Sequence, residues 1–259
     1  MIDLLRAEWI KLRTVTMNWV LGSIAVAFPL LVTLLTAAFT KNNDDDGRAI
    51  GGLDTEGLIS VLTGTTIVSA LLCGVIAAAS ITSEFGFGTI RPTFAATPQR
   101  SRVIAAKGLV VVAATTALAT IVQLVGWFVG GALATSQGST IDLADVPTGL
   151  PAMVGAVVLT AFMSLAGFGL GLIIRSTPAA VSVLIVWALI AESLVGPLLV
   201  LVFSSENIAR WMPFQAGIRL ALVDVFEAGP SRLTSGVYFG AFSLLLVVVG
   251  GWMVNRRDA

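Results

Sequence analysis

The sequence lacks histidine altogether and contains a single cysteine, Cys73. Without an imidazole, the chain has no side chain of the type that most often serves as a general base, a proton shuttle, or a haem or zinc ligand. One cysteine can form no disulfide within the chain and no thiolate cluster for a metal. These absences argue against covalent chemistry, so we expect no catalytic residue and no metal site.

Charged residues are also scarce. They make up 12% of the 259 residues, whereas 56% are apolar and the mean hydropathy is +0.95. A soluble domain usually carries about 25% charged residues, so the polar side chains here are too few to cover a globule of this size. The formal net charge is zero, which excludes a general basic field for binding nucleic acid.

The sequence is instead rich in long apolar runs. A helix needs about 20 apolar residues to cross a hydrocarbon core of roughly 30 Å, and six runs are long enough. We therefore predict an all-α membrane protein whose residues 1–259 form a single transmembrane domain. The predicted spans are residues 17–39, 58–81, 103–134, 151–174, 178–203 and 234–254.

Lysine and arginine are distributed unevenly between the two sides of this layout. With the N-terminus in the cytoplasm, ten of the fifteen lie inside and five outside, as the positive-inside rule requires. We predict a multi-pass protein of the plasma (cell) membrane with both termini in the cytoplasm. The five residues outside are Lys41, Arg48, Arg210, Arg219 and Arg232.

The N-terminal segment, residues 1–16, has an amphipathic pattern. As a helix it would carry Ile2, Leu5, Trp9 and Leu12 on one face. This pattern predicts a helix lying in the inner membrane interface before the first span. The alternative is a plain cytoplasmic lead with basic side chains that extend to the headgroups.

The segment between the fifth and sixth predicted spans, residues 204–233, is too apolar for a solvated loop. Pro213 interrupts it, and the part that follows is too short to cross a bilayer. Backbone at that depth must be covered by protein or line a cavity. We predict one or two short helices that form a cap over the outer mouth.

The connection between the second and third predicted spans, residues 83–102, is much longer than a turn requires. Gly86 and Gly88 allow the chain to leave the second helix in conformations closed to other residues. Pro98 fits the first turn of the next helix. Residues 89–96 combine a fixed charge with apolar side chains, which predicts a docking element for a soluble partner.

Several short motifs occur in order on this six-span layout. They are Ala7-Glu8-Trp9-Ile10-Lys11-Leu12-Arg13, then Glu84, Gly88-Thr89-Ile90-Arg91, Thr97-Pro98-Gln99-Arg100-Ser101-Arg102 and Lys107, and finally Trp211-Met212-Pro213-Phe214. Together they resemble the ABC-2 superfamily of transporter permeases. In that family the loop after the second span is a coupling helix that docks on a nucleotide-binding subunit.

The resemblance implies roles for individual residues of this loop. The residues implied to form the surface that docks on the ATPase are Glu84, Gly88, Thr89, Ile90, Arg91, Phe94 and Pro98. Those implied to anchor it to the inner headgroups are Arg100, Arg102 and Lys107. For the three basic residues, the alternative is that they merely follow the positive-inside rule. The chain has no G-x-x-x-x-G-K-[ST] phosphate loop, so we expect ATP and Mg to be bound by a partner ATPase and no cofactor by this chain.

Glu192 is the one firm acid within a predicted span. A carboxylate at mid-depth costs about 2.5–3.5 kcal/mol by insertion scales, so it should face protein or water. It either contributes to the outer part of the translocation path or packs against a neighbouring helix or cap groups such as Arg210 and Arg219. Pro197 removes the backbone bond to Ser193, which predicts a kink there.

Other features bear on packing alone. Gln123 in the third span is expected to hydrogen-bond to a neighbouring helix. Glycine pairs at G-x-x-x-G spacing would allow close helix approach, although such spacings arise readily by chance among 26 glycines. The pairs are Gly126/Gly130, Gly167/Gly171 and Gly236/Gly240.

We therefore predict the permease subunit of an ATP-binding-cassette transporter that exports a hydrophobic or amphipathic substrate. It would work with an ATPase subunit, a second permease chain (an identical copy or a sister) and membrane lipid, with no nucleic acid as partner. Following the family, the substrate would pass between the paired second and fifth spans. The alternatives are an ion-coupled secondary transporter that uses Glu192, and a membrane scaffold or sensor that transports nothing.

Overall fold

The protein is represented by a computed structural model that describes residues 2–40, 53–90, 92–93, 99–204, 211–223 and 230–256. Across these ranges the regular structure is helical and contains no strand, so the all-α prediction is confirmed. The elements are α1 (Ile2–Thr14), α2 (Thr16–Phe39), α3 (Thr55–Gly86), α5 (Arg100–Ser136), the 3₁₀ turn η1 (Leu143–Asp145), α6 (Gly149–Ile174), α7 (Thr177–Val186), the π turn η2 (Trp187–Ala191), α8 (Glu192–Phe203), α10 (Pro213–Ile218) and α11 (Arg232–Arg256).

Six of the described helical segments are long and apolar enough to cross a membrane, which confirms the predicted number of spans. They are α2, α3, α5, α6, the continuous segment Thr177–Phe203 and α11. The helix α3 extends beyond the predicted residues 58–81 at both ends. Its early start has a local cause, because the Asp54 side chain accepts a hydrogen bond from the Gly57 amide at 2.8 Å and caps the helix.

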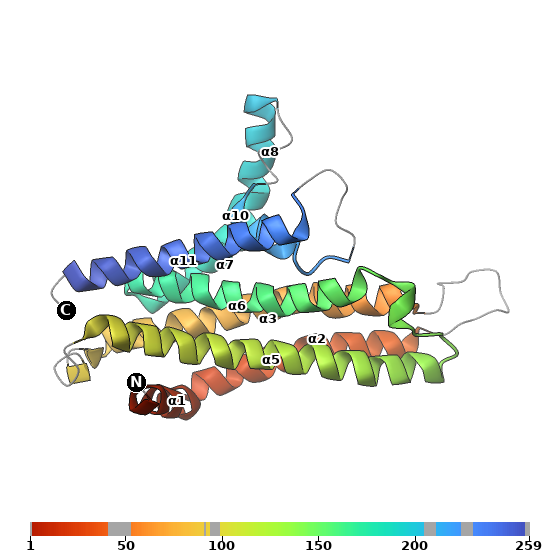
Figure 1. The fold of residues 1–259 in the computed structure, drawn as a ribbon, viewed down its shortest axis with the longest axis horizontal. Coiled ribbons are helices and arrows are strands. Elements are labelled where there is room, and N and C mark those ends of the chain that lie inside the picture. Colours follow the sequence, from red (N-terminus) through yellow and green to blue (C-terminus); the bar gives the residue numbers. More distant parts are fainter. Residues whose placement is uncertain are drawn as a thin grey trace.

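The two central helices are α3 and α6, which pack side by side along their length (Figure 1). More than half of the apolar stretch of each is buried, 61% and 56%, against 33% or less for the other four spans. The helices α2 and α5 cover one side of this pair and α11 covers the other. Gln123 of α5 donates to the Thr66 hydroxyl of α3 at 2.9 Å, so the expected bond between helices is present.

Glycines allow the backbones of α3 and α6 to approach closely. A Cβ atom at Gly167 would lie 2.1 Å from the Gly74 carbonyl oxygen, and one at Gly171 would lie 2.9 Å from that of Ala78. Either substitution would force the two helices apart. The pair Gly167/Gly171 is therefore a true helix contact.

The fifth span changes direction in its middle. Its first half, α7, runs with the bundle, whereas α8 turns away from it (Figure 1). The change occurs at the π turn Trp187–Ala191, which precedes Pro197. A π turn inserts an extra residue into the helix and is a known cause of kinks, so the kink expected at Pro197 lies earlier in the chain. Most apolar side chains of α8 are exposed in this single chain.

The short helix α10 lies in the predicted cap segment, of which residues 204, 211–223 and 230–233 are described. Phe214 of α10 packs in an aromatic group with Phe239 and Phe242 of α11. The hydroxyl of Tyr238 donates to the carbonyl of Trp211 at 2.8 Å. These contacts hold the described residues 211–223 against α11.

The start of α1, the last turn of α3, the first turn of α5 and the end of α11 lie at the same end of the bundle (Figure 1). We call this the α1 end. The connection from α5 to α6 and the helix α10 lie toward the other half of the molecule (Figure 1).

Candidate functional site

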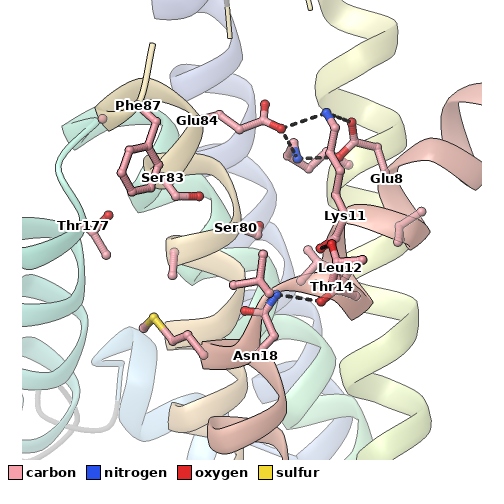
Figure 2. A pocket seen from close by; sticks show the side chains of 17 residues that line it. Glu8, Lys11, Leu12, Thr14, Asn18, Ser80, Ser83, Glu84, Phe87 and Thr177 are labelled. Atoms are coloured by element: carbon pink, nitrogen blue, oxygen red, sulfur yellow. Dashed lines mark hydrogen bonds and ion pairs between the residues drawn. The ribbon is translucent and has the colours of Figure 1, made fainter. Parts of the chain in front are cut away.

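Four charged side chains meet at the α1 end. The ammonium of Lys11 lies 2.9 Å from Glu8 Oε1 and 2.9 Å from Glu84 Oε1. The ammonium of Lys107 lies 2.9 Å from the same Glu84 oxygen and also pairs with Glu8 Oε2. Figure 2 shows Glu8, Lys11 and Glu84 pointing toward one another. The four residues form a closed ring of alternating charge, here called the ion cluster.

The ion cluster joins three helices. Glu8 and Lys11 come from α1, Glu84 from the last turn of α3, and Lys107 from α5. Glu8, Lys107 and Glu84 are buried and retain 4%, 5% and 8% of their accessible surface. Of the four, Lys11 alone is substantially exposed. Removing several charges from water is costly unless each has a partner of opposite sign. Each lysine here contacts both glutamates, so the cluster is electrically balanced.

Lys11 keeps its charge well into the alkaline range. Burial acts against the ammonium form, but hydrogen bonds and charge interactions with Glu8 and Glu84 outweigh it, so the pKa of Lys11 lies above its ordinary value of 10.5. A raised lysine pKa contributes stability that is complete below the ordinary pKa and is lost as the pH rises through the folded pKa. Lys11 therefore carries its charge at neutral pH.

The position of α1 is fixed from both sides. Asn18 Nδ2 of α2 donates to the Leu12 carbonyl at 2.9 Å, and Trp19 Nε1 donates to the Arg13 carbonyl at 2.6 Å. Leu4 and Leu12 pack against the core that contains Ile90. These contacts hold α1 against α2 and α5, so its carboxylate and ammonium reach the ends of α3 and α5.

A cavity of about 550 Å³ adjoins the ion cluster and is lined by residues of α1, α2, α3, α5 and α7 (Figure 2). One carboxylate oxygen at its wall, Glu84 Oε2, is buried and has no hydrogen-bond partner among the described residues. At the start of α7, Thr177 shares a 2.7 Å hydrogen bond with Thr82 of α3. The fifth span is therefore tied to the second close to the ion cluster. No three potential metal-ligating side chains gather in the described part of the chain.

The segment that follows Glu84 is only partly described. Gly88 has a φ of +69°, a conformation that favours glycine. The Thr89 hydroxyl lies 3.5 Å from the Glu84 carbonyl, Ile90 is buried in the core, and Phe87 is 84% exposed. Three predicted docking residues, Arg91, Phe94 and Pro98, lie outside the described residues.

The basic residues predicted to anchor this segment differ in their surroundings. Arg102 is exposed near the start of α5 and Arg100 is half-buried, and headgroup contact remains a prediction for both. Lys107, by contrast, is buried. Its ammonium is 2.9 Å from Glu84 and paired with Glu8 inside the protein, because this position on α5 faces α1 and α3.

Glu8 and Lys11 are functional candidates that the amphipathic pattern did not identify. Ile2 and Trp9 of the predicted apolar face are exposed, as a face in contact with the membrane interface would be, and that contact stays a prediction. Glu8 is buried on another side of the helix. The protein-facing side carries Leu4, Glu8 and Lys11, which follow the helical spacing i, i+4, i+7. That spacing is visible in the sequence, but two of its three residues are charged. It therefore does not stand out as the side of the helix that faces the protein.

Glu192 lies far from the ion cluster and is buried with 2% exposure. Its two carboxylate oxygens accept hydrogen bonds from the backbone amides of Phe214 and Gln215 at 3.0 and 2.8 Å. Pro213, the residue before them, has no amide hydrogen to donate. The carboxylate therefore holds the start of α10 onto the fifth span through two backbone donors.

Comparison with known proteins identifies the family. The model of the ABC-2 family transporter proteins matches residues 4–191, a range that contains the whole ion cluster and ends one residue before Glu192. None of the curated proteins compared with the chain matches it. The family match covers more than two thirds of the 259 residues, and the six apolar helices agree with it. The chain belongs to the ABC-2 family of transporter membrane proteins.

Proposed function

We propose that this chain is the permease of an ATP-driven exporter and that a separate ATPase docks on residues 83–102 at the α1 end. On this proposal the α1 end faces the cytoplasm of a cell with the protein in its plasma membrane, both termini are cytoplasmic, and ATP and Mg are bound by the partner. The excess of lysine and arginine on that side supports the orientation.

The observation that carries the proposal is the position of Glu84. It lies in the last turn of α3, at the start of the proposed docking segment, and its Oε1 atom contacts lysines of both α1 and α5. A force applied to the docking segment therefore reaches three helices through a single carboxylate. Ile90, buried in the same core as Leu4 and Leu12, gives the segment a second, apolar attachment.

The same end of the bundle can pass this movement to the fifth span. Thr82 and Thr177 join α3 to α7 through a hydrogen bond of 2.7 Å, and the guanidinium of Arg175 lies 4.9 Å from the ring centre of Phe85. Movement of the α3 terminus would therefore turn α7, and the π turn Trp187–Ala191 gives the fifth span a place to bend. Such a bistable bundle is what an ATPase can bias.

A second permease chain would complete the transport path. In this single chain α8 exposes much of its apolar surface, and α3 leaves an open stripe at Ser60, Gly64 and Val68. These two surfaces belong to the fifth and second spans, between which the substrate passes on this proposal. The apolar character of the α8 surface favours a hydrophobic or amphipathic substrate. The partner chain is either a second copy or a sister permease.

The proposal is tested by measuring the ATP hydrolysis that co-purifies with the chain. The full chain is tagged, purified from its native membrane in mild detergent, and assayed for Mg-dependent ATP hydrolysis. Phe87→Ala removes an aromatic ring of the docking segment that is 84% exposed. Phe39→Ala removes a ring of similar exposure, 80%, at the far end of α2. We expect Phe87→Ala to lose most of the co-purifying hydrolysis and Phe39→Ala to keep it. Equal retention by both variants would contradict docking at this site.

A further inference from the structure

A second cavity, of about 750 Å³, lies on the outside of the bundle between α1, α2 and α5. Its lining differs from that of the cavity at the ion cluster: it is mostly apolar and contains none of the four cluster residues. We call it the α1–α2–α5 groove. It faces the surroundings of the bundle, which for a membrane-spanning chain is lipid.

Small side chains create the groove. On α2 these are Gly22, Ser23 and Ala27, and on α5 they are Ala114 and Ala117. The bottom is closed, since a Cβ atom at Gly22 would already be in ordinary contact with Leu118 at 3.7 Å. The groove runs between these two packed helices, and the buried side chains of Ile76 on α3 and Thr115 on α5 form part of its lining.

The length of the groove matches one leaflet of a bilayer. Along α2 its lining runs from Asn18 to Leu30, which is about 18 Å at 1.5 Å per residue. A hydrocarbon core is roughly 30 Å thick, so the groove begins at the interface and ends near the bilayer centre. An acyl chain of a lipid in the leaflet on the α1 side fits this depth.

The mouth of the groove carries a cation and two indole rings. Arg13, Trp9 and Trp19 all line it, and the hydrogen bonds from Trp19 to the Arg13 carbonyl and from Asn18 to the Leu12 carbonyl hold this corner in place. Tryptophan is enriched at the membrane interface. The Arg13 side chain is exposed and makes no hydrogen bond or ion pair with the residues described in the structure. A guanidinium available at headgroup depth is suited to bind a phosphate in a bidentate manner.

We propose that the α1–α2–α5 groove binds one anionic phospholipid of the α1-side leaflet, with its phosphate at Arg13 and one acyl chain between α2 and α5. The charge of Arg13 selects the anionic headgroup and the small residues of the groove admit the chain. This site goes beyond the proposed transport function, since it needs neither an ATPase nor a substrate.

The test uses the delipidated full chain in detergent and measures lipid binding by native mass spectrometry and by thermal stabilisation. Phosphatidylglycerol is compared with phosphatidylcholine of the same acyl chains, and with glycerol phosphate as a headgroup without chains. We expect phosphatidylglycerol to bind more tightly than phosphatidylcholine, and glycerol phosphate not to compete at equal concentration. Competition by glycerol phosphate, or equal binding of both lipids, would overturn the proposal.

Matched variants separate the two parts of the site. Arg13→Gln removes a charge-assisted contact and should weaken phosphatidylglycerol binding about tenfold or more, whereas Arg6→Gln, which alters another exposed arginine of α1 outside the groove, should not. Ala117→Phe fills the groove and should abolish binding of the lipid, whereas Ala241→Phe on the exposed side of α11 should leave it intact. Ser23→Leu fills the same groove from α2 and serves if Ala117→Phe does not fold. Equal effects within either matched pair would overturn the proposal.

Discussion

The ammonium of Lys107 lies 2.9 Å from Glu84 Oε1, and this contact ties the last turn of α3 to α5 across a buried interface. Glu84 and Lys107 are separated by the whole connection that is proposed to receive the ATPase. The two ends of that connection are thus bound to each other and, through Glu8 and Lys11, to α1.

Removing one charge of the ion cluster should destabilise the protein strongly. In Lys107→Met, Glu8 keeps only Lys11 as a partner and two carboxylates remain buried together, so we expect the free energy of unfolding to fall by about 3–5 kcal/mol. Thermal or denaturant unfolding in detergent measures this change. Arg102→Met, on the exposed side of the same helix, is the control and should change stability little. A loss below about 1 kcal/mol for Lys107→Met would show that the cluster is not closed.

The contribution of Lys11 should depend on pH in a defined direction. Because its pKa is raised above 10.5, the stability difference between the wild type and Lys11→Met should be constant from neutral pH up to that value. Above it the difference should shrink as Lys11 loses its proton in the folded state. Unfolding curves of both proteins across this range provide the measurement. A difference that disappears well below pH 10.5 would mean that the glutamates do not act on Lys11.

The contact between α3 and α6 should tolerate no side chain larger than hydrogen at Gly167. A Cβ atom there would lie 2.1 Å from a backbone oxygen that cannot rotate away, so Gly167→Ala should lower the free energy of unfolding by about 1–3 kcal/mol or more. Gly251→Ala in α11 is the matched control, because a Cβ atom there meets nothing within 4 Å. If both variants unfold at the same temperature, the helices are farther apart than described.

Glu192 should stabilise the position of α10 on the fifth span. In Glu192→Gln the amide group can accept from one backbone donor but presents its own hydrogens to the other, which leaves a buried amide of Phe214 or Gln215 unpaired at a cost of about 1–3 kcal/mol. We expect faster proteolysis near α10 and an unchanged level of co-purifying ATP hydrolysis.

The same variant separates the proposed function from an ion-coupled transporter. If Glu192 carried a coupling proton, Glu192→Gln would abolish transport that depends on a proton gradient. With the carboxylate engaged by α10, ATP-dependent transport should survive both the substitution and the collapse of the gradient by an uncoupler. Loss of transport on collapse of the gradient, with ATP present, would favour the ion-coupled alternative.

Apolar length predicts most of this fold, because a membrane span is specified by a long run of apolar residues and little else. The π turn at Trp187–Ala191 could not be anticipated, since its residues are ordinary helix formers in lipid and the visible signal, Pro197, lies farther along. The G-x-x-x-G spacing at Gly167 is visible in the sequence, but it does not show what each glycine meets. A Cβ atom at Gly167 would meet backbone of α3, whereas Cβ atoms at Gly126 and Gly240 would meet side chains of neighbouring helices.

The site was predicted less completely than the fold. Glu84 and Lys107 stand out as charged residues at the ends of apolar runs, but their partners Glu8 and Lys11 lie far away in the chain. Pairing of this kind depends on how α1 folds back against α5, which is set by the bonds from Asn18 and Trp19. No local pattern in residues 1–16 predicts that α1 folds back in this way.

Docking of an ATPase at residues 83–102 is tested by a reactive group placed within that segment. In a Cys73→Ala background, Phe87→Cys is labelled with a membrane-impermeant maleimide, both in intact cells and in inverted vesicles. In a second experiment the same cysteine is modified with a photo-crosslinking reagent. We expect labelling from the cytoplasmic side alone and a cross-link to an ATP-binding protein. Labelling from outside the cell, or cross-links to lipid and to no protein, would contradict this docking.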